Sequence, residues 1–261
     1  MKPKAMISLA LAAAAVAMLA VSTPLRASAG EDTFETSFRK TYAYQTYLKD
    51  DAIRAEVTTD GVVTLTGTVA EQSHQTLAQA IAANLAGVVR VDNRLVIGNE
   101  AAATNRDVSI AREVNLALRF HRNVNDGRTY VTVTDGVVTL QGVASGTAQK
   151  ELLAAFVADV AGVKGVQNEM TVATTLEPVA QTSNETLDDA SITAQVVTAL
   201  MTHRSTSSVI TRVTTRNGEV TLTGITMNDA QNAMIVKLVT DIRGVTSVKN
   251  QMTVENAPRT N

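Results

Sequence analysis

Stretches of alternating and of helically spaced apolar residues recur three times along the chain, in the same order. Each repeat has a short run in which every second residue is apolar, as in Val63 and Leu65, followed by a stretch with apolar residues four apart, as in Leu77 and Ile81. Alternation is typical of a half-buried strand, and a spacing of four marks one face of a helix. The pattern therefore predicts repeated units that contain both strands and helices.

An eight-residue motif marks each repeat. It runs from Asp60 to Gly67, from Asp135 to Gly142 and from Asn217 to Gly224, and its first two residues are Asp-Gly or Asn-Gly. A Gly-Val pair begins 20 residues after the second glycine of each motif, and an Asn follows 6 residues later. Because this spacing is identical in all three places, the chain contains three copies of one module.

The landmarks predict the elements of one copy. Asp-Gly or Asn-Gly between two strand-like runs indicates a hairpin with a type I′ turn, in which both central residues have positive φ. The first strand then ends at Thr59, Thr134 or Arg216. The apolar residues of the second strand are expected to face the core. They are Val63 and Leu65, Val138 and Leu140, and Val220 and Leu222.

Helical spacing on both sides of the hairpin completes the module. A second helix follows it, a glycine is expected to end that helix in a left-handed cap, and a third strand comes last. An opening helix precedes the hairpin. The second helix is marked by Leu77, Ile81 and Leu85, by Leu152, Phe156 and Val160, and by Met234, Leu238 and Ile242 in the three copies. The third strand is marked by Asn93, Leu95 and Ile97, by Asn168, Met170 and Val172, and by Asn250, Met252 and Val254. The opening helix is clearest at Ile110, Val114 and Leu118 and at Ile192, Val196 and Leu200.

The predicted fold class is α+β, with three tandem αββαβ modules that each pack two helices on a three-stranded sheet. The modules span 34–98, 106–173 and 187–255, and the stretches 99–105 and 174–186 are expected to be linkers. Nine glycines are assigned to structural turns and caps. They are Gly61, Gly67, Gly87, Gly136, Gly142, Gly162, Gly218, Gly224 and Gly244.

Residues 1–29 have the pattern of a secretory signal peptide. Lys2 and Lys4 precede an apolar run from Ala5 to Val21, and a small-residue site ends at Ala29. We expect cleavage before Gly30 and a periplasmic location. An uncleaved anchor is the alternative, because the apolar run is nearly long enough to span a bilayer.

Charge and composition exclude several functions. Loss of residues 1–29 removes three cations and no acid, so the net charge of −2 becomes −5. Bulk attraction to nucleic acid is therefore not expected, and contact with any polyanion must be local. The chain has no Cys, only three His, no nucleophile elbow and no phosphate-binding glycine loop. We expect no enzyme, no metal site and no cofactor.

The motif Asp-Gly-Val-Val-Thr-Leu-Thr-Gly, the Gly-Val pair 20 residues later and the Asn of the last strand resemble the BON (bacterial osmotically inducible and nodulation) family. The resemblance covers most of residues 34–255. It implies an envelope protein of αββαβ modules, often periplasmic and associated with osmotic or envelope stress. It also implies binding of phospholipid or, for some members, assistance to other envelope polypeptides.

The opening helix of the first copy is the most distinctive stretch. It carries five of the eight aromatic residues, and Phe34, Phe38 and Tyr42 recur at the spacing of a core stripe. Tyr44 and Tyr47 need not share that stripe, and exposed tyrosines are common at membrane and protein interfaces. We therefore consider Tyr44 and Tyr47 candidate contacts for lipid or a partner.

A His-Arg pair lies near the end of the opening helix in the other two copies. The pairs are His121-Arg122 and His203-Arg204. Cations there are expected to bond the last carbonyls of their own helix, and contact with an anionic headgroup is the alternative.

Two other polar positions have structural explanations. Asp60 and Asp135 are not expected to be acid/base groups, because Asn217 occupies the same position in the third copy. The strand residues Asn93, Asn168 and Asn250 are expected to satisfy backbone groups, with a ligand contact as the alternative.

Three functional hypotheses follow from the sequence. The first is an exported, non-enzymatic envelope protein that contacts anionic phospholipid and supports the envelope under stress. The second is a chaperone-like protein that holds envelope polypeptides through sheet edges. The third is a structural spacer in the envelope.

Overall fold

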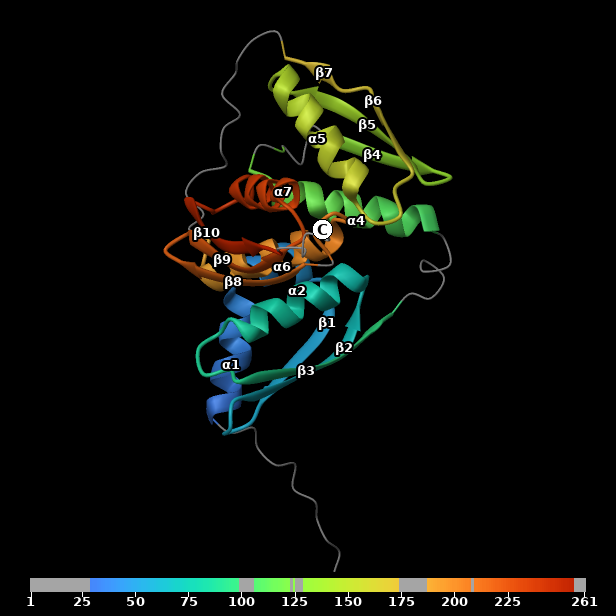
Figure 1. The fold of residues 1–261 in the computed structure, drawn as a ribbon. Helices are drawn as coiled ribbons and strands as arrows, with labels where there is room; N and C mark the ends of the chain where they lie inside the picture. The colour runs from blue at the N-terminus through green and yellow to red at the C-terminus, as the bar shows by residue number, and fades with distance from the viewer. Residues whose placement is uncertain are drawn as a thin grey trace, which may run out of the picture.

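A computed structural model describes residues 29–98, 106–122, 124, 129–173, 187–207 and 209–255. These residues form three modules, each with helices packed on one face of a mixed sheet (Figure 1). The predicted α+β fold of three αββαβ modules is therefore confirmed. Apart from Ala29, the expected signal peptide lies outside the described residues, as do both expected linkers.

The elements follow one another in the predicted order. Module 1 contains α1 (Ala29–Lys40), a π-helical turn (Tyr44–Leu48), β1 (Ala52–Val57), β2 (Val62–Val69), α2 (Gln72–Ala83) and β3 (Arg90–Ile97). Module 2 contains α4 (Arg106–Phe120), β4 (Thr129–Thr134), β5 (Val137–Ala144), α5 (Thr147–Asp159), β6 (Gly165–Asn168) and β7 (Thr171–Val172). Module 3 contains α6 (Asp189–Thr202), β8 (Ile210–Arg216), β9 (Glu219–Thr226), α7 (Asp229–Thr240) and β10 (Ser247–Val254).

The second strand is central in every sheet. It pairs antiparallel with the first strand through the hairpin and parallel with the third, which the second helix connects. In module 2 the third strand is divided into β6 and β7, and both pieces pair with β5. The third strand therefore lies at a sheet edge in each module.

The core lies where the helices meet the sheets and one another. The predicted inward residues of the second strands are fully buried. Modules 1 and 3 share one apolar core, which also takes in Phe120 and Phe156 of module 2. The central helix, α6, is buried on nearly all sides and packs on α2 and α4. Helices α2, α4 and α6 thus lie together near the middle of the molecule (Figure 1).

The hairpins differ between the copies. In modules 2 and 3 both central residues have positive φ, for example 52° at Asp135 and 81° at Gly136, so the predicted type I′ turn is confirmed there. In module 1 that prediction is wrong. Only Gly61 has positive φ, and its N–H donates to the Thr58 carbonyl at 2.9 Å in a longer connection.

The hairpin glycine of module 1 is required by a close approach. A Cβ on Gly61 would lie 2.4 Å from the Gly87 carbonyl oxygen. Gly87, Gly162 and Gly244 are left-handed, as predicted, but they do not cap the second helices. Those helices end three or four residues earlier, so the glycines instead reverse the chain before the third strand.

The second glycine of each motif is not in a turn, which corrects another assignment. Gly67, Gly142 and Gly224 lie inside β2, β5 and β9 with φ of 117°, 130° and 146°. A Cβ on Gly67 would lie 1.9 Å from the Ala52 carbonyl oxygen of the neighbouring strand. The strands approach too closely there for a side chain.

The third-strand asparagines satisfy backbone groups, as expected. The side-chain oxygens of Asn93, Asn168 and Asn250 accept from the N–H two residues later at 3.1, 3.2 and 3.0 Å. Their amides also donate to the second helix, to the Gln75 carbonyl in module 1. Each Asn therefore fastens an edge strand to the helix beside it.

Module junctions and a candidate binding surface

Tyr44 and Tyr47 are buried, with exposed fractions of 3% and 7%, so the exposure expected of them is wrong. The Tyr44 ring packs edge-on against Phe38 at 5.2 Å, and burial raises the pKa of its hydroxyl. The Tyr47 ring packs on Phe120 of module 2 at 5.2 Å. A contact with lipid or a partner would require these rings to leave the core.

The two His-Arg pairs form the junction between modules 2 and 3. His121 follows α4 and bridges to Ile242 after α7, whereas His203 follows α6 and bridges to Val160 after α5. The opening helix of each module thus ends against the second helix of the other. This reciprocal contact is what we call the latch junction.

Backbone hydrogen bonds hold both halves of the latch junction. Arg122 N–H donates to the Asp241 carbonyl at 2.9 Å, and Arg204 N–H donates to the Asp159 carbonyl at 2.8 Å. The Arg243 N–H donates back to Phe120, and the Ala161 N–H donates back to Thr202. The same pattern therefore occurs twice, as in a pseudo-two-fold pair.

The arginines bond helix carbonyls, but not those of their own helices. Arg122 Nη2 donates to the carbonyls of Thr240 at 2.5 Å and Val245 at 2.6 Å, and Arg204 donates to that of Ala158. The expectation that they bond their own helix is wrong, because each helix ends beside that of the neighbouring module. These cations complement the negative ends of α7 and α5.

The sequence explains why module 1 does not take part in the latch junction. Asp159 and Asp241 lie three residues before the left-handed glycine, and module 1 has Asn84 in that position. The Asn84 side chain donates to the Ala80 carbonyl at 2.7 Å and so bonds the end of its own helix. Module 1 instead joins module 3 through α2 and α6.

An acidic group lies where α2 meets α4. His74 contacts Asp51 through Nδ1 at 2.6 Å and Glu71 through Nε2 at 3.3 Å. Burial, together with the negative charge of Glu71, raises the pKa of Glu113 to about 7. No cluster of three or more ligand side chains that could hold a metal is found in the described part of the chain.

Sequence reasoning missed a pair of aspartates that support the hairpins. The Asp107 carboxylate accepts from the backbone N–H groups of Asp135 and Gly136 at 2.7 and 2.8 Å. Asp189 does the same for Asn217 and Gly218 in module 3. The available signal was the constant separation of 28 residues between each aspartate and its turn.

The sheet of module 3 presents an exposed, locally basic surface. The register places side chains that do not face the core on one side, which we call the outward face. Arg212, Arg216 and Lys249 are exposed there, with Glu219 as the one acidic residue on these strands. Other members of the outward face are Thr214, Thr221, Thr223, Gln251 and Thr253. The outward face is therefore positively charged, although the net charge of the chain is negative.

Apolar side chains lie at one end of this surface. Ile225 of β9 is 59% exposed, and Met227, just beyond the strand, is 60% exposed. A hollow of about 370 Å³ at the hairpin end is lined by threonines together with Arg216 and Glu219. The surface therefore combines cations, hydroxyls and exposed aliphatic groups.

Each module exposes an aliphatic side chain in the same cross-strand pair, on the third strand in module 1 and on the second strand in modules 2 and 3. Val96 faces outward opposite Thr68, Val143 opposite Thr171, and Ile225 opposite Thr253. All three aliphatic residues are exposed. One outward apolar group therefore lies in this pair in every sheet, but not at the same position of the repeat.

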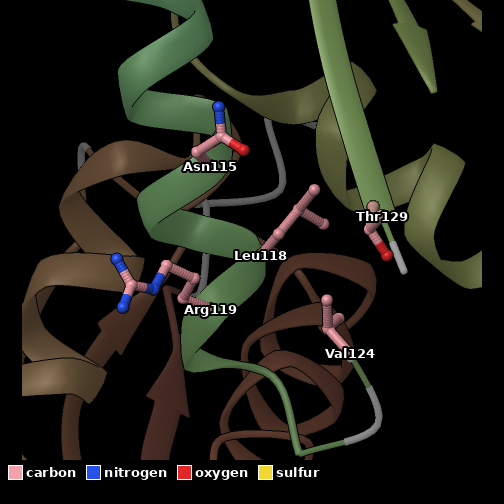
Figure 2. A pocket seen from close by; sticks show the side chains of 5 residues that line it. All are labelled: Asn115, Leu118, Arg119, Val124 and Thr129. Carbon is pink, nitrogen blue, oxygen red and sulfur yellow. The ribbon is translucent and has the colours of Figure 1, made fainter. Parts of the chain in front are cut away.

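A further pocket of about 270 Å³ lies between α4 and the start of β4. Figure 2 shows Leu118 and Val124 directed toward it and the Arg119 guanidinium directed away. That guanidinium lies over the Tyr47 ring instead, 5.3 Å from its centroid. The pocket therefore offers little beyond Asn115 and Thr129 for polar recognition.

Comparison with known proteins agrees with this repeat. The BON domain matches residues 31–99, 106–174 and 188–256. Osmotically-inducible protein Y of Escherichia coli (strain K12) is 38% identical over 71 residues, which cover 27% of this chain and 35% of that protein. The chain thus matches about a third of the length of that relative.

Solved structures add little. The C-terminal domain of CdsD, a structural protein of the type III secretion system of Chlamydia trachomatis, has 17% identity and a TM-score of 0.23, with 82% of this chain and 96% of that one covered. The PrgH periplasmic domain has 10% identity and a TM-score of 0.20, with 80% and 98% covered. Similarity this low does not indicate a shared function.

The identity of the modules follows from the domain matches. No helix among the described residues is long and apolar enough to cross a membrane. BON domains are non-catalytic binding domains. Because three matches together cover more than half of the sequence, this chain belongs to the BON domain family.

Proposed function

We propose that this chain is an exported, non-enzymatic binding protein of the bacterial envelope that contacts anionic phospholipid through the outward face of module 3. The proposal includes a periplasmic location and a role in envelope integrity under osmotic or other stress. The apparent signal peptide and the similarity to an osmotically inducible protein support the location and the role.

The observation that carries the proposal is the composition of the outward face. Arg212, Arg216 and Lys249 gather on a chain whose expected mature charge is −5. Cations near an anionic bilayer contribute roughly 1 kcal/mol each, and adjacent apolar groups can enter the headgroup boundary. Ile225 and Met227 supply such groups at the same surface.

Sedimentation of the chain from residue 30 onward with lipid vesicles tests this proposal. We expect more binding to anionic than to neutral vesicles, with a loss at high salt. The triple variant Arg212→Gln, Arg216→Gln and Lys249→Gln is expected to bind on the order of 100-fold more weakly. The lipid proposal fails if the chain does not distinguish the two kinds of vesicle.

A matched variant separates local from overall charge. Lys40, Lys49 and Lys237 are exposed and lie on helices or a turn, away from the outward face. Their replacement by Gln changes the net charge by the same amount and is expected to leave vesicle binding nearly unchanged. Equal losses in the two triple variants would mean that the outward face has no special role.

A chaperone-like role is the second candidate, and one observation favours it. Tyr130 on the edge strand β4 is 64% exposed, and the register places it diagonally from the outward Val143. An edge strand with exposed apolar neighbours can accept an extended polypeptide. Suppression of a client's aggregation by the chain, and its loss in Tyr130→Thr with Val143→Thr, would support this role.

A further inference from the structure

Three aromatic side chains fill the centre of the latch junction. The His121 ring stacks on Phe156 with centroids 4.3 Å apart and planes 7° apart. The His203 ring meets Phe156 edge-on at 6.1 Å. Both histidines are only 1% exposed, so each is enclosed by the contact between modules 2 and 3.

Each histidine has one carboxylate neighbour from the other module. His121 Nδ1 lies 2.8 Å from an Asp241 oxygen, and His203 Nδ1 lies 3.6 Å from an Asp159 oxygen. His121 Nε2 and both ring nitrogens of His203 have no hydrogen-bond partner within the described structure. A proton added at those nitrogens would therefore create a buried charge with few partners.

We propose that the latch junction is a proton-sensitive switch: neutral His121, stacked in the junction, keeps modules 2 and 3 in contact, and its protonation separates the two modules. This goes beyond the proposed lipid contact, because it concerns a different surface and does not depend on any ligand.

The charges around the two rings decide the direction of the switch. Burial lowers the pKa of His121, and the hydrogen bond and charge of Asp241 only partly offset that effect. Burial acts to raise the pKa of Asp159, but the nearby His203 and the hydrogen bonds from Ser205 lower it overall, so this carboxylate stays ionised in mild acid. Arg122 and Arg204 directly follow the two histidines in the chain. Arg243 lies across the junction, where its N–H donates to the Phe120 carbonyl.

The sign of the effect follows from these shifts. A histidine whose pKa is lowered in the closed state binds its proton more readily when the modules separate. Closure is therefore favoured above the ordinary histidine pKa of 6.5 and is weakened as pH falls below it. Each pKa unit of difference changes the ratio of closed to open molecules by roughly tenfold.

Module 2 is the part expected to move. Modules 1 and 3 share one apolar core, whereas module 2 has a core of its own and reaches the shared one mainly with Leu116, Phe120 and Phe156. Separation at the latch junction can therefore leave the contact between α2 and α6 in place.

Distance measurements on the chain from residue 30 onward test this switch. The chain has no Cys, so Gln141→Cys on β5 and Gln251→Cys on β10 provide two unique sites for spin labels. We expect a single distance at pH 7.5 and a growing population at a longer distance at pH 5.0, with far-UV circular dichroism unchanged. An unchanged distance, or loss of helix signal along with the distance change, would overturn the proposal.

Histidine variants show which groups respond. His121→Gln keeps a hydrogen-bonding side chain that does not titrate, and this variant is expected to stay closed at pH 5.0. His74→Gln, which removes the histidine of module 1, is expected to open as the unmodified chain does. If that variant does not fold, NMR titration of the His121 ring replaces it, and titration of this ring without the distance change refutes the switch.

Discussion

Glu113→Gln should remove the loss of unfolding free energy that ionisation of Glu113 causes at high pH. Glu113 lies on α4, close to Glu71 and His74. Glu71 is the residue just before α2, and His74 lies in its first turn. Burial raises the pKa of Glu113 from 4.5 to about 7, and the charge of Glu71 adds to the shift. The neutral carboxyl is therefore the form that the folded protein favours.

The magnitude follows from the two pKa values. A gap of roughly 2.5 pKa units corresponds to about 3 kcal/mol, which is an upper value because the side chain is partly exposed. A raised carboxyl pKa means that the folded state holds its proton more tightly than the unfolded state. The contribution is therefore complete below pH 4.5 and is lost as pH rises through 7.

Urea denaturation at several pH values checks this prediction. Relative to Glu113→Gln, the unmodified chain should lose up to about 3 kcal/mol of unfolding free energy between pH 4 and pH 8. Other titrating groups affect both proteins alike, so the difference isolates this carboxyl. Glu151→Gln changes an exposed glutamate on α5 and should show no such trend. Parallel pH profiles for the unmodified chain and Glu113→Gln would refute the reasoning.

Three further substitutions probe the turns and the core. Gly61→Ala should lower the midpoint of thermal unfolding more than Gly87→Ala, because a Cβ meets a carbonyl at 2.4 Å in the first case and nothing within 4 Å in the second. Equal shifts would contradict the close approach. Asp107→Asn should cost about 1–2 kcal/mol and speed hydrogen exchange at the Asp135 amide, since an amide nitrogen cannot accept the bond that the carboxylate oxygen accepts. Slow exchange in that variant would count against this role. Phe156→Ala should cost about 3–5 kcal/mol in urea denaturation and speed proteolysis between modules 2 and 3, whereas a cost below 1 kcal/mol would show that the ring does not hold the junction.

Most of the fold could be predicted because the same pattern of apolar and turn residues occurs three times in the sequence. Val63, Val138 and Val220 occupy equivalent positions, and their agreement identifies a buried strand more firmly than one alternating run could. Asp-Gly and Asn-Gly likewise predict the hairpins. The turn type in module 1 could not be read from those two residues, because it depends on how far β1 continues and on the Gly87 carbonyl nearby.

The candidate residues could be found but not placed. His121 and His203 stood out by their equivalent positions, yet the carboxylates beside them, Asp241 and Asp159, lie more than forty residues away in another module. Periodicity within one module contains no information about which helix ends meet. Tyr47 was misjudged for the same reason, since Phe120 from module 2 covers its ring. The outward face was missed because strand register decides which cations share a side.

The reciprocal contact between modules 2 and 3 also sets an order of folding. The acceptors of Arg122 lie 118 to 123 residues later in the chain, at Thr240 and Val245, so this closure has a long loop to bridge. Module 2 can form its own sheet before those residues are available, but the end of α4 cannot reach its final partners. We expect the half of the latch junction at His121 to be the last part of the molecule to assemble, and a chain interrupted before α7 to retain the hairpin of module 2 while His121 lacks its Asp241 partner.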